Sequence, residues 1–208
     1  MTNDPLLEMP TADLYLQTYS GGQFHYEPDG VREISIIDIS ISLAGIPRFL
    51  RQSRGFLSVA EHCLAVSGTI EAEGGSDRLQ LLGLLHDCEE AYIGDWPSPL
   101  VAFLQRKYAV DLKAFKRDIR LSILKALDIE PPTPAEQEEI ARVDMLALAA
   151  ERALFMPSSL PWHIDHLDVP DYVTAQYAHL DSDQARMFFE RAYYRLSGSV
   201  DFERRVPA

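Results

Sequence analysis

Two histidines and two aspartates in this chain have the residue types and the spacing of a metal site. The four candidates are His62, the adjacent pair His86 and Asp87, and the distant Asp144. Imidazole nitrogens combined with carboxylate oxygens favour a divalent transition metal (Mn, Fe, Co, Ni or Zn) over Ca or Mg, which prefer oxygen ligands. Four protein ligands leave positions for water only on a five- or six-coordinate ion, so we expect octahedral coordination with bound water. Such an ion activates water and binds phosphoryl oxygens, as hydrolysis of a phosphate ester requires.

Asp144 is the most informative of the four candidates. If it lies on a helix, its neighbours three and four residues away are all apolar: Ile140, Ala141, Ala147 and Leu148. A buried, ionised aspartate is costly without a partner, and a bound metal is a common partner. The alternative is a salt bridge from Asp144 to Arg142 or Arg152.

Further residues near His86 have side chains that could take part in the same chemistry. Glu90 and Asp95 are close enough in sequence to share the metal site, and on a continuous helix Glu90 would project beside His86. Trp96 could stack on a nucleobase, and packing between helices is an equally good interpretation. For Tyr92, packing is the favoured interpretation.

Other polar clusters have simpler interpretations. The segment 162–166 contains Trp162, His163, Asp165 and His166, and we interpret it as a solvated loop. The two cysteines, Cys63 and Cys88, are too few for a disulfide framework and are interpreted as small core residues.

Apolar periodicity and capping signals predict that the four ligands come from three helices. These helices are expected over 59–74, from 76 or 77 to near 94, and from 134 to before 157. Their start signals are Ser58-x-x-Glu61, Ser76-Asp77 and Thr133-x-x-Glu136. A bundle of this kind can surround an ion with side chains.

The remaining elements complete the expected fold. Residues 12–28 are predicted to form a β-hairpin, and 34–43 a helix, although its β-branched residues would also suit a strand. Further helices are expected from Ser98-Pro99, where Ser98 would be the N-cap, over 112–127 and over 182–196, with a loop over 157–170. The sequence therefore predicts one all-α domain over 1–208, a helical bundle with a small N-terminal β-hairpin.

Composition restricts the classes of partner. The 208 residues are 47% hydrophobic and carry a formal net charge of −13, which argues against a nucleic acid polymer as partner. A small anionic substrate is still compatible, because a metal and a few arginines can reverse the field inside a pocket. We expect no membrane span and no secretory signal, since the N-terminus is neither basic nor strongly apolar. With only two cysteines, the expected compartment is the cytoplasm.

The chain resembles the HD superfamily of metal-dependent phosphohydrolases. The resemblance rests on His62, His86-Asp87 and Asp144, and on a longer string that resembles the bacterial 5′-deoxynucleotidase branch and its phage dATP triphosphohydrolase relatives. That string is His86-Asp-x-x-Glu90-x-x-x-Gly94-Asp95-x-Pro97-x-Pro99. Further matching pieces are Pro47-Arg48-Phe49, Ser58-Val-Ala-Glu-His62 and Val143 to Glu151. Together they cover about residues 20 to 155.

The resemblance implies an HD-domain fold and a role for each matching residue. His62, His86, Asp87 and Asp144 would hold the metal. The remaining roles are Glu90 as general acid/base, Asp95 in orienting water or a sugar hydroxyl, and Arg48 in binding phosphate. The resemblance also implies a possible homodimer, although the aromatic residues of the last helix are more typical of a core.

Two positions depart from the pattern of the resemblance. Relatives often have Gly-His where this chain has Arg51-Gln52, and a lysine where it has Val101. Without that lysine, the same phosphate contacts, and a triphosphate substrate in particular, are less well supported. Candidates to replace it are Arg51, Arg54, Arg106 and Lys107.

The leading hypothesis is a phosphohydrolase that removes phosphate from a nucleotide substrate, in particular a deoxyribonucleoside 5′-phosphate. One alternative is an iron-dependent oxygenase on the same helices, which usually needs two metals and additional histidines. The other alternative is a nucleotide sensor without catalysis, whose expected mark would be a lost ligand or a lost acid. No such loss is found in the matching residues.

Overall fold

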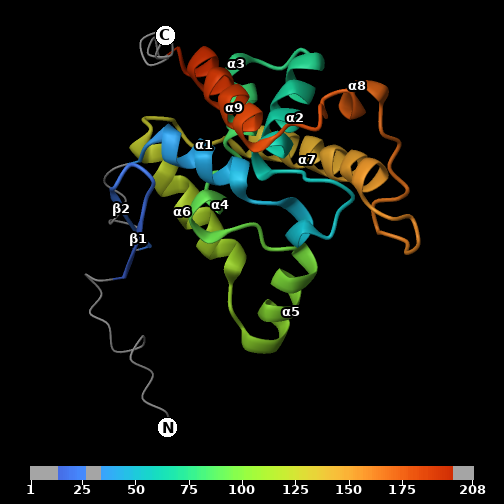
Figure 1. Cartoon of the computed structure of the whole chain (residues 1–208), viewed down its shortest axis with the longest axis horizontal. Coiled ribbons are helices and arrows are strands. Elements are labelled where there is room, and N and C mark those ends of the chain that lie inside the picture. Colours follow the sequence, from blue (N-terminus) through green and yellow to red (C-terminus); the bar gives the residue numbers. More distant parts are fainter. Residues whose placement is uncertain (1–13, 27–33, 199–208) are drawn as a thin grey trace.

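The computed structural model describes residues 14–26 and 34–198, and within them it is a helical bundle with one two-stranded sheet (Figure 1). The elements from the N-terminus to the first metal-site helix are β1 (Tyr15–Gln17), β2 (Gln23–His25), α1 (Ile36–Gly45), the 3-10 helix η3 (Arg48–Arg51) and α2 (Val59–Ala72). They are followed by α3 (Asp77–Leu84), α4 (Glu90–Ile93), α5 (Ser98–Tyr108), α6 (Leu112–Ala126), α7 (Pro134–Phe155), α8 (Asp171–Thr174) and α9 (Ser182–Ser197). The predicted all-α class is confirmed.

Side-chain caps fix where most of the longer helices begin. Ser35, Ser58 and Ser76 each accept a hydrogen bond from a backbone N–H in the first turn of α1, α2 and α3. Thr133 begins α7 with a complete capping box, as predicted, and Asp181 does the same for α9. The prediction for α5 was wrong in detail, because Ser98 is its first helical residue and Pro97 precedes it without a side-chain cap.

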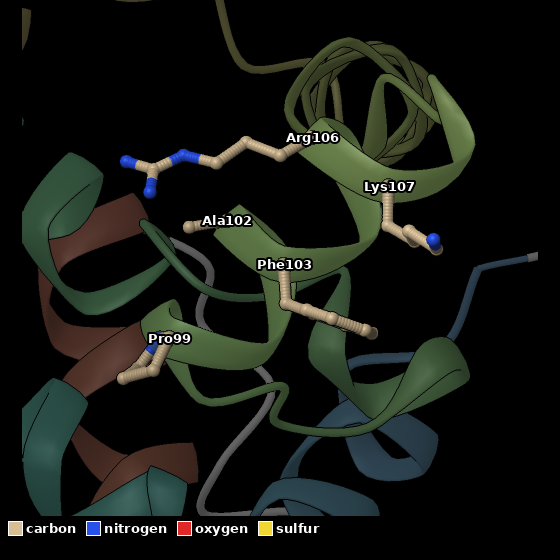
Figure 2. Close-up of a pocket in the computed structure, with 5 residues that line it drawn as sticks. All are labelled: Pro99, Ala102, Phe103, Arg106 and Lys107. Atoms are coloured by element: carbon tan, nitrogen blue, oxygen red, sulfur yellow. The ribbon is translucent and has the colours of Figure 1, made fainter.

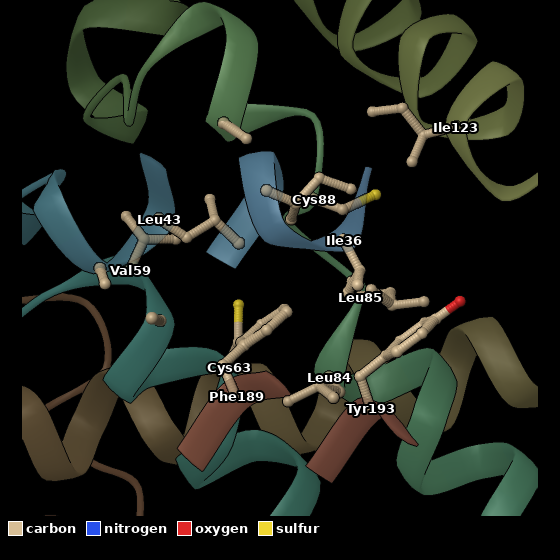
Figure 3. Packing of buried hydrophobic residues seen from close by; sticks show 14 of the residues in the cluster. Ile36, Leu43, Val59, Cys63, Leu84, Leu85, Cys88, Ile123, Phe189 and Tyr193 are labelled. Carbon is tan, nitrogen blue, oxygen red and sulfur yellow. The ribbon is translucent and has the colours of Figure 1, made fainter. Parts of the chain in front are cut away.

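The main core lies where α1, α2, α3 and α9 meet (Figure 3). Among its fully buried side chains are Leu43, Cys63, Leu84 and Phe189. Gly83 allows α2 and α3 to approach closely, since a Cβ at this position would lie only 2.6 Å from Cδ1 of Ile70. Both cysteines are buried and free, which confirms their interpretation as small core residues.

The expected continuous helix from 77 to 94 is interrupted, and this corrects the sequence-based prediction. The helix α3 ends at Leu84, a series of turns occupies 85–89, and α4 resumes at Glu90. In the turns, backbone hydrogen bonds reach back only three residues, as from Cys88 N to Leu85 O (3.1 Å). Nδ1 of His86 donates a hydrogen bond to the Gly83 carbonyl (2.8 Å). In a continuous helix, this carbonyl would accept from the backbone N–H four residues later. His86 and Asp87 therefore lie in a turn.

The predicted β-hairpin is present, with Leu16 paired opposite Phe24. The hairpin is fastened to α1 by the buried Asp38, whose carboxylate accepts hydrogen bonds from the backbone N–H and the hydroxyl of Ser20 (2.8 and 2.7 Å). Phe24 also stacks on Tyr92 with ring centroids 3.8 Å apart, so the packing interpretation of Tyr92 is confirmed. Residues 12, 13, 27 and 28 of the predicted hairpin lie outside the described residues.

The α5–α6 segment extends from one side of the bundle (Figure 1). The helix α6 is amphipathic, and it packs on the core through its buried Ile119, Ile123 and Leu124. The predicted loop over 157–170 is confirmed, and α8 follows it without having been predicted. Across the described ranges, none of the helices combines the length and the apolarity that crossing a bilayer demands.

Glu61 does not complete the capping box that its spacing from Ser58 suggested. Its buried carboxylate instead accepts hydrogen bonds from the backbone N–H groups of Ala178 (3.1 Å) and Leu180 (3.2 Å). This carboxylate therefore ties α2 to the segment that leads into α9.

Replacing this buried carboxylate should destabilise the fold. We expect Glu61→Ala to lower the free energy of unfolding by about 2 kcal/mol or more, because it leaves two backbone donors without their charged acceptor. Chemical denaturation of the metal-free protein measures the change. The control is Glu71→Ala on the exposed face of the same helix, which should cost less than about 1 kcal/mol. Equal effects of the two variants would contradict this role for Glu61.

Candidate metal centre

The four predicted metal ligands come together at one point. His62 is contributed by α2, His86 and Asp87 by the turn after α3, and Asp144 by α7. Nε2 of His62 lies 3.2 Å from Nε2 of His86, 3.1 Å from Oδ1 of Asp144 and 3.7 Å from Oδ2 of Asp87. Nε2 of His86 lies 3.2 Å from the same Asp87 oxygen and 3.8 Å from the same Asp144 oxygen.

These separations suit ligands that share one ion. With metal–ligand bonds of about 2.1 Å, two ligands at a right angle are about 3.0 Å apart, and two at the tetrahedral angle about 3.4 Å. The observed distances of 3.1 to 3.8 Å lie at or slightly above these values. The group of His62, His86 and Asp87 could therefore hold a metal ion, with Asp144 beside both imidazoles as the fourth candidate.

Hydrogen bonds on the far side of each imidazole fix which nitrogen faces the site. Nδ1 of His86 donates to the Gly83 carbonyl, which can only accept. Nδ1 of His62 donates to Oε1 of Glu151 at 2.7 Å. In the neutral rings, both Nε2 atoms therefore direct lone pairs at each other and at two carboxylates. This arrangement of four electron-pair donors repels itself unless a cation lies between them.

The protonation of the histidines follows the same electrostatics. Burial lowers the pKa of His86, but the carboxylates of Asp87 and Asp144 outweigh burial and raise it well above its usual value. Burial raises the pKa of Asp144, and the two imidazoles outweigh it and lower that pKa below its usual range. The carboxylates therefore favour positive charge at this point, which a metal dication supplies when it displaces the protons.

The alternative partners for Asp144 are engaged elsewhere. Arg142 forms ion pairs with Glu73 and Glu139 on the outside of the bundle. Arg152 donates to two carbonyls of the following loop, those of Pro157 and Leu160 (both 2.6 Å). The salt-bridge interpretation of Asp144 therefore fails.

Glu151 is a buried residue of the site whose function the sequence-based prediction missed. Its Oε1 accepts from Nδ1 of His62 and from the hydroxyl of Tyr177 (3.0 Å), and its Oε2 accepts from Arg48 (2.8 Å). A carboxylate behind a ligating histidine fixes the orientation of the ring and increases its basicity. The available signal was its position seven residues after Asp144, which is about two turns along the same helix face.

Arg48, which was predicted to bind phosphate, is paired with a buried carboxylate of the site. Its guanidinium is buried and donates through Nε (3.2 Å) and Nη2 (2.8 Å) to Glu151. Nη1 has no hydrogen-bond partner among the described residues. The side chain is directed inward by a left-handed turn, in which Phe49, Leu50 and Arg51 all have positive φ angles of 52 to 64°. Arg48 therefore supports the site from behind, with one N–H group left for a ligand.

Glu90 has an environment suited to proton transfer. Its carboxyl group is buried, Oε1 accepts from Nζ of Lys116 at 2.6 Å, and Oε2 has no partner within the described chain. Burial raises the pKa of Glu90 to about 8, with Asp87 adding to the effect and Lys116 opposing it. A carboxyl group with such a pKa can hold or release a proton near neutral pH.

Lys116 and Arg120 were also missed, although they are four residues apart on one face of the predicted helix. Arg120 binds Glu89 through two hydrogen bonds (2.6 and 2.8 Å) and lies 3.7 Å from Oδ1 of Asp87. A second cluster of potential ligands (Asp87, Glu89 and Glu90) is thus neutralised by these two cations. The arrangement favours one metal ion over two.

Asp95 follows α4 within electrostatic range of Arg48 and Asp87, and Trp96 is the next residue in the chain. Burial raises the pKa of the partly buried Asp95, and Arg48 opposes this rise. Trp96 is 39% exposed, and its Nε1 donates to the carbonyl of Ile93 at 2.8 Å. Its ring is therefore held in place by the chain with a face open to solvent.

The basic residues considered as replacements for the absent lysine lie elsewhere. Arg106 and Lys107 line a shallow pocket of about 460 Å³ on α5 that contains none of the four ligands. Figure 2 shows Arg106 extending to one side of this helix and Lys107 to the other. Arg51 donates to the Gly55 carbonyl of its own loop at 2.6 Å. Lys116, by contrast, contacts the carboxylates beside the centre, with Nζ 3.4 Å from Glu89 and 2.6 Å from Glu90.

The 162–166 loop packs against α7 and lies apart from the centre. The guanidinium of Arg152 lies 5.1 Å from the ring centroid of Trp162 and 3.5 Å from Oδ1 of Asp165. In the described part of the chain, His163 and His166 belong to no group of potential metal ligands. Their interpretation as loop residues agrees with this placement.

Removing one ligand should remove the metal. We expect Asp87→Ala to reduce bound metal from one equivalent per chain to near zero. The variant loses one ligand and one negative charge, so the three remaining donors bind the ion weakly. Elemental analysis after dialysis against trace metal measures the content. The control His163→Ala should keep one equivalent. Full metal content in Asp87→Ala, with the fold intact by circular dichroism, would contradict the assignment.

Glu151 should affect metal affinity without touching the metal. We expect Glu151→Gln to weaken metal binding by about 10- to 100-fold, because the His62 ring loses its charged acceptor. Tyr177→Phe, which removes only one hydrogen bond to the same carboxylate, should have a smaller effect. Competition with a chelator measures both dissociation constants. An unchanged constant in Glu151→Gln would show that this contact is only structural.

Comparison with known proteins provides one informative relative. No family model matches the chain. The chain is 32% identical over 138 residues to a protein from Escherichia coli (strain K12) whose name is "Uncharacterized protein YfdR". The matched region covers 66% of this chain and 70% of that relative, and the relative's name assigns no activity. On this similarity, the chain belongs to the same protein family as YfdR.

Proposed function

We propose that the protein is a metal-dependent phosphohydrolase that cleaves phosphate from nucleotides, with deoxyribonucleoside 5′-phosphates as its substrates. The observation that carries this proposal is the unpartnered, buried Oε2 of Glu90 close to a group of potential metal ligands, His62, His86 and Asp87, with Asp144 beside both imidazoles. A divalent transition metal held by those donors would lower the pKa of a bound water and neutralise phosphoryl oxygens. Everything else that the reaction needs must come from the side chains around the site.

Three cations support an anionic substrate. Arg48, Lys116 and Arg120 all lie within the electrostatic range of Asp87, although the protein as a whole is strongly acidic. Nη1 of Arg48 has no partner in the described chain and can donate to a phosphoryl oxygen. Together with a metal dication, these cations would offset most of the carboxylate charge around the site, which would otherwise repel a phosphate group.

Glu90 is proposed to manage the proton of the attacking water. Lys116 holds Oε1 and leaves Oε2 as the atom that accepts the proton. The same carboxyl group can then deliver that proton to the leaving alkoxide oxygen. Asp95, beside Arg48, is proposed to orient the water or a sugar hydroxyl, and the exposed face of Trp96 to contact the nucleoside.

The choice of a 5′-deoxyribonucleotide rests on resemblance to the HD superfamily. The turn that carries His86 and Asp87 is followed by α4 with Glu90 and then by Gly94-Asp95-x-Pro97-x-Pro99, and this string resembles the bacterial 5′-deoxynucleotidase branch. Neutralisation of the second carboxylate cluster by Lys116 and Arg120 supports a single metal and disfavours a two-metal oxygenase. The presence of Glu90 disfavours a sensor that has lost its acid.

Phosphate release with a matched pair of variants tests the proposal. The metal-loaded protein should release phosphate from at least one nucleotide in a screen of ribo- and deoxyribonucleotides with Mn, Co and Ni. We expect Glu90→Gln to keep the metal and lower kcat by about 10²- to 10⁴-fold, because it removes the proton acceptor and retains the shape. A folded, metal-loaded wild-type protein that releases no phosphate, pyrophosphate or triphosphate would refute the function. Dioxygen uptake with reduced iron, or tight nucleotide binding without turnover, would support the alternatives.

A further inference from the structure

A pocket of about 190 Å³ opens directly beside the metal ligands, between α6 and α7. Three of the four ligands form part of its wall: His86, Asp87 and Asp144. Its volume is about six times the roughly 30 Å³ that a water molecule occupies in the liquid, so one flat ring system fits and a bulky group does not. A molecule bound to the metal through phosphate could therefore place its organic part here.

The wall combines apolar side chains with the polar groups of the metal centre. Its apolar part is formed by Leu82, Leu85, Leu124, Pro132, Ile140 and Ala141, and the rest of the lining is polar or charged. A ring placed against the apolar part would lose its contact with water, which is favourable for an apolar face. A pocket that joins an apolar surface to polar groups suits a small organic molecule with a charged end.

One polar side chain lies in the wall without a partner of its own. Gln137 is exposed on the second turn of α7, and within the described chain its side-chain amide makes no hydrogen bond. An amide offers a donor and an acceptor side by side, which matches the paired donor and acceptor on the edge of a nucleobase. Arg120 also lines the pocket, but its guanidinium is hydrogen-bonded to Glu89 and is therefore less available to bind a ligand.

We propose that the α6–α7 pocket binds the nucleobase of the substrate, with Gln137 reading its edge. The apolar part of the wall holds the ring, and the phosphate points toward the metal donors. This inference rests on the proposed function, because the ring belongs to the ester that is hydrolysed at the metal. It adds Gln137 on α7 as a residue that determines base specificity, in addition to Trp96 after α4.

Ala141 provides the direct test, because it lines the pocket and is itself exposed. Ala141→Leu fills the pocket without disturbing the core. Ala153→Leu, also exposed on α7 but outside the pocket, is the matched control. We expect Ala141→Leu to keep its metal and lower kcat/KM for the best nucleotide by about tenfold or more, since a pocket misfit of this size has that effect. The control Ala153→Leu should leave kcat/KM for the same nucleotide within about twofold of wild type.

Nucleoside binding separates this inference from the proposed function. Calorimetry with unphosphorylated nucleosides on the metal-loaded protein should detect binding to wild type and to Ala153→Leu, and at least about tenfold weaker binding to Ala141→Leu. Gln137→Ala should weaken binding of some nucleosides more than others, because it removes a base-reading group and leaves the wall intact. If the wild type cleaves no nucleotide but binds nucleosides with this pattern, the pocket assignment stands and the function fails. If all variants bind and cleave as the wild type does, the pocket assignment is overturned and the function stands.

Discussion

Mutual repulsion among four electron-pair donors is the constraint around which this molecule is organised. The two imidazole nitrogens lie 3.2 Å from each other and 3.1 to 3.8 Å from oxygens of Asp87 and Asp144, and in the neutral rings the protons are on the opposite nitrogens. Such an arrangement is stable only with positive charge at its centre. The donors stay close together because α2, the turn after α3, and α7, which carry them, are packed in the hydrophobic cores of the bundle.

Buried polar groups behind the donors make the arrangement rigid. Glu151 accepts hydrogen bonds from His62, Tyr177 and Arg48, so one carboxylate connects α2, α7, η3 and the segment after α8. On the opposite side, Lys116 and Arg120 neutralise Glu90 and Glu89. Each of the three cations, Arg48, Lys116 and Arg120, is thus paired with a carboxylate beside the centre. These pairs reduce the negative charge around the site in a protein that is acidic as a whole. The partly apolar pocket beside the centre then offers a second environment for the rest of the same substrate.

Local signals in the sequence were enough for much of the fold and for the ligand set. Helix starts such as Thr133 were predictable because a capping box acts within four residues. The prediction that Asp144 lies on a buried stripe was wrong in detail, because its side chain is 39% exposed, although one of its oxygens lies 3.1 Å from Nε2 of His62. The break after Leu84 was not predictable, since it depends on a histidine ring competing with the backbone for one carbonyl. The inward pairing of Arg48 with Glu151, 103 residues later, also depends on tertiary packing. The same applies to Lys116 and Arg120, whose partners lie in another segment.

Anomalous diffraction from crystals of the manganese- or cobalt-loaded protein tests the central claim most directly, because it locates the metal independently of any activity. The account predicts one strong peak per chain, within bonding distance of Nε2 of His62, Nε2 of His86 and one oxygen each of Asp87 and Asp144. It also predicts that Glu151 remains hydrogen-bonded to His62 in that structure. A peak at the 162–166 loop instead, or a centre from which Asp144 has turned away, would contradict it.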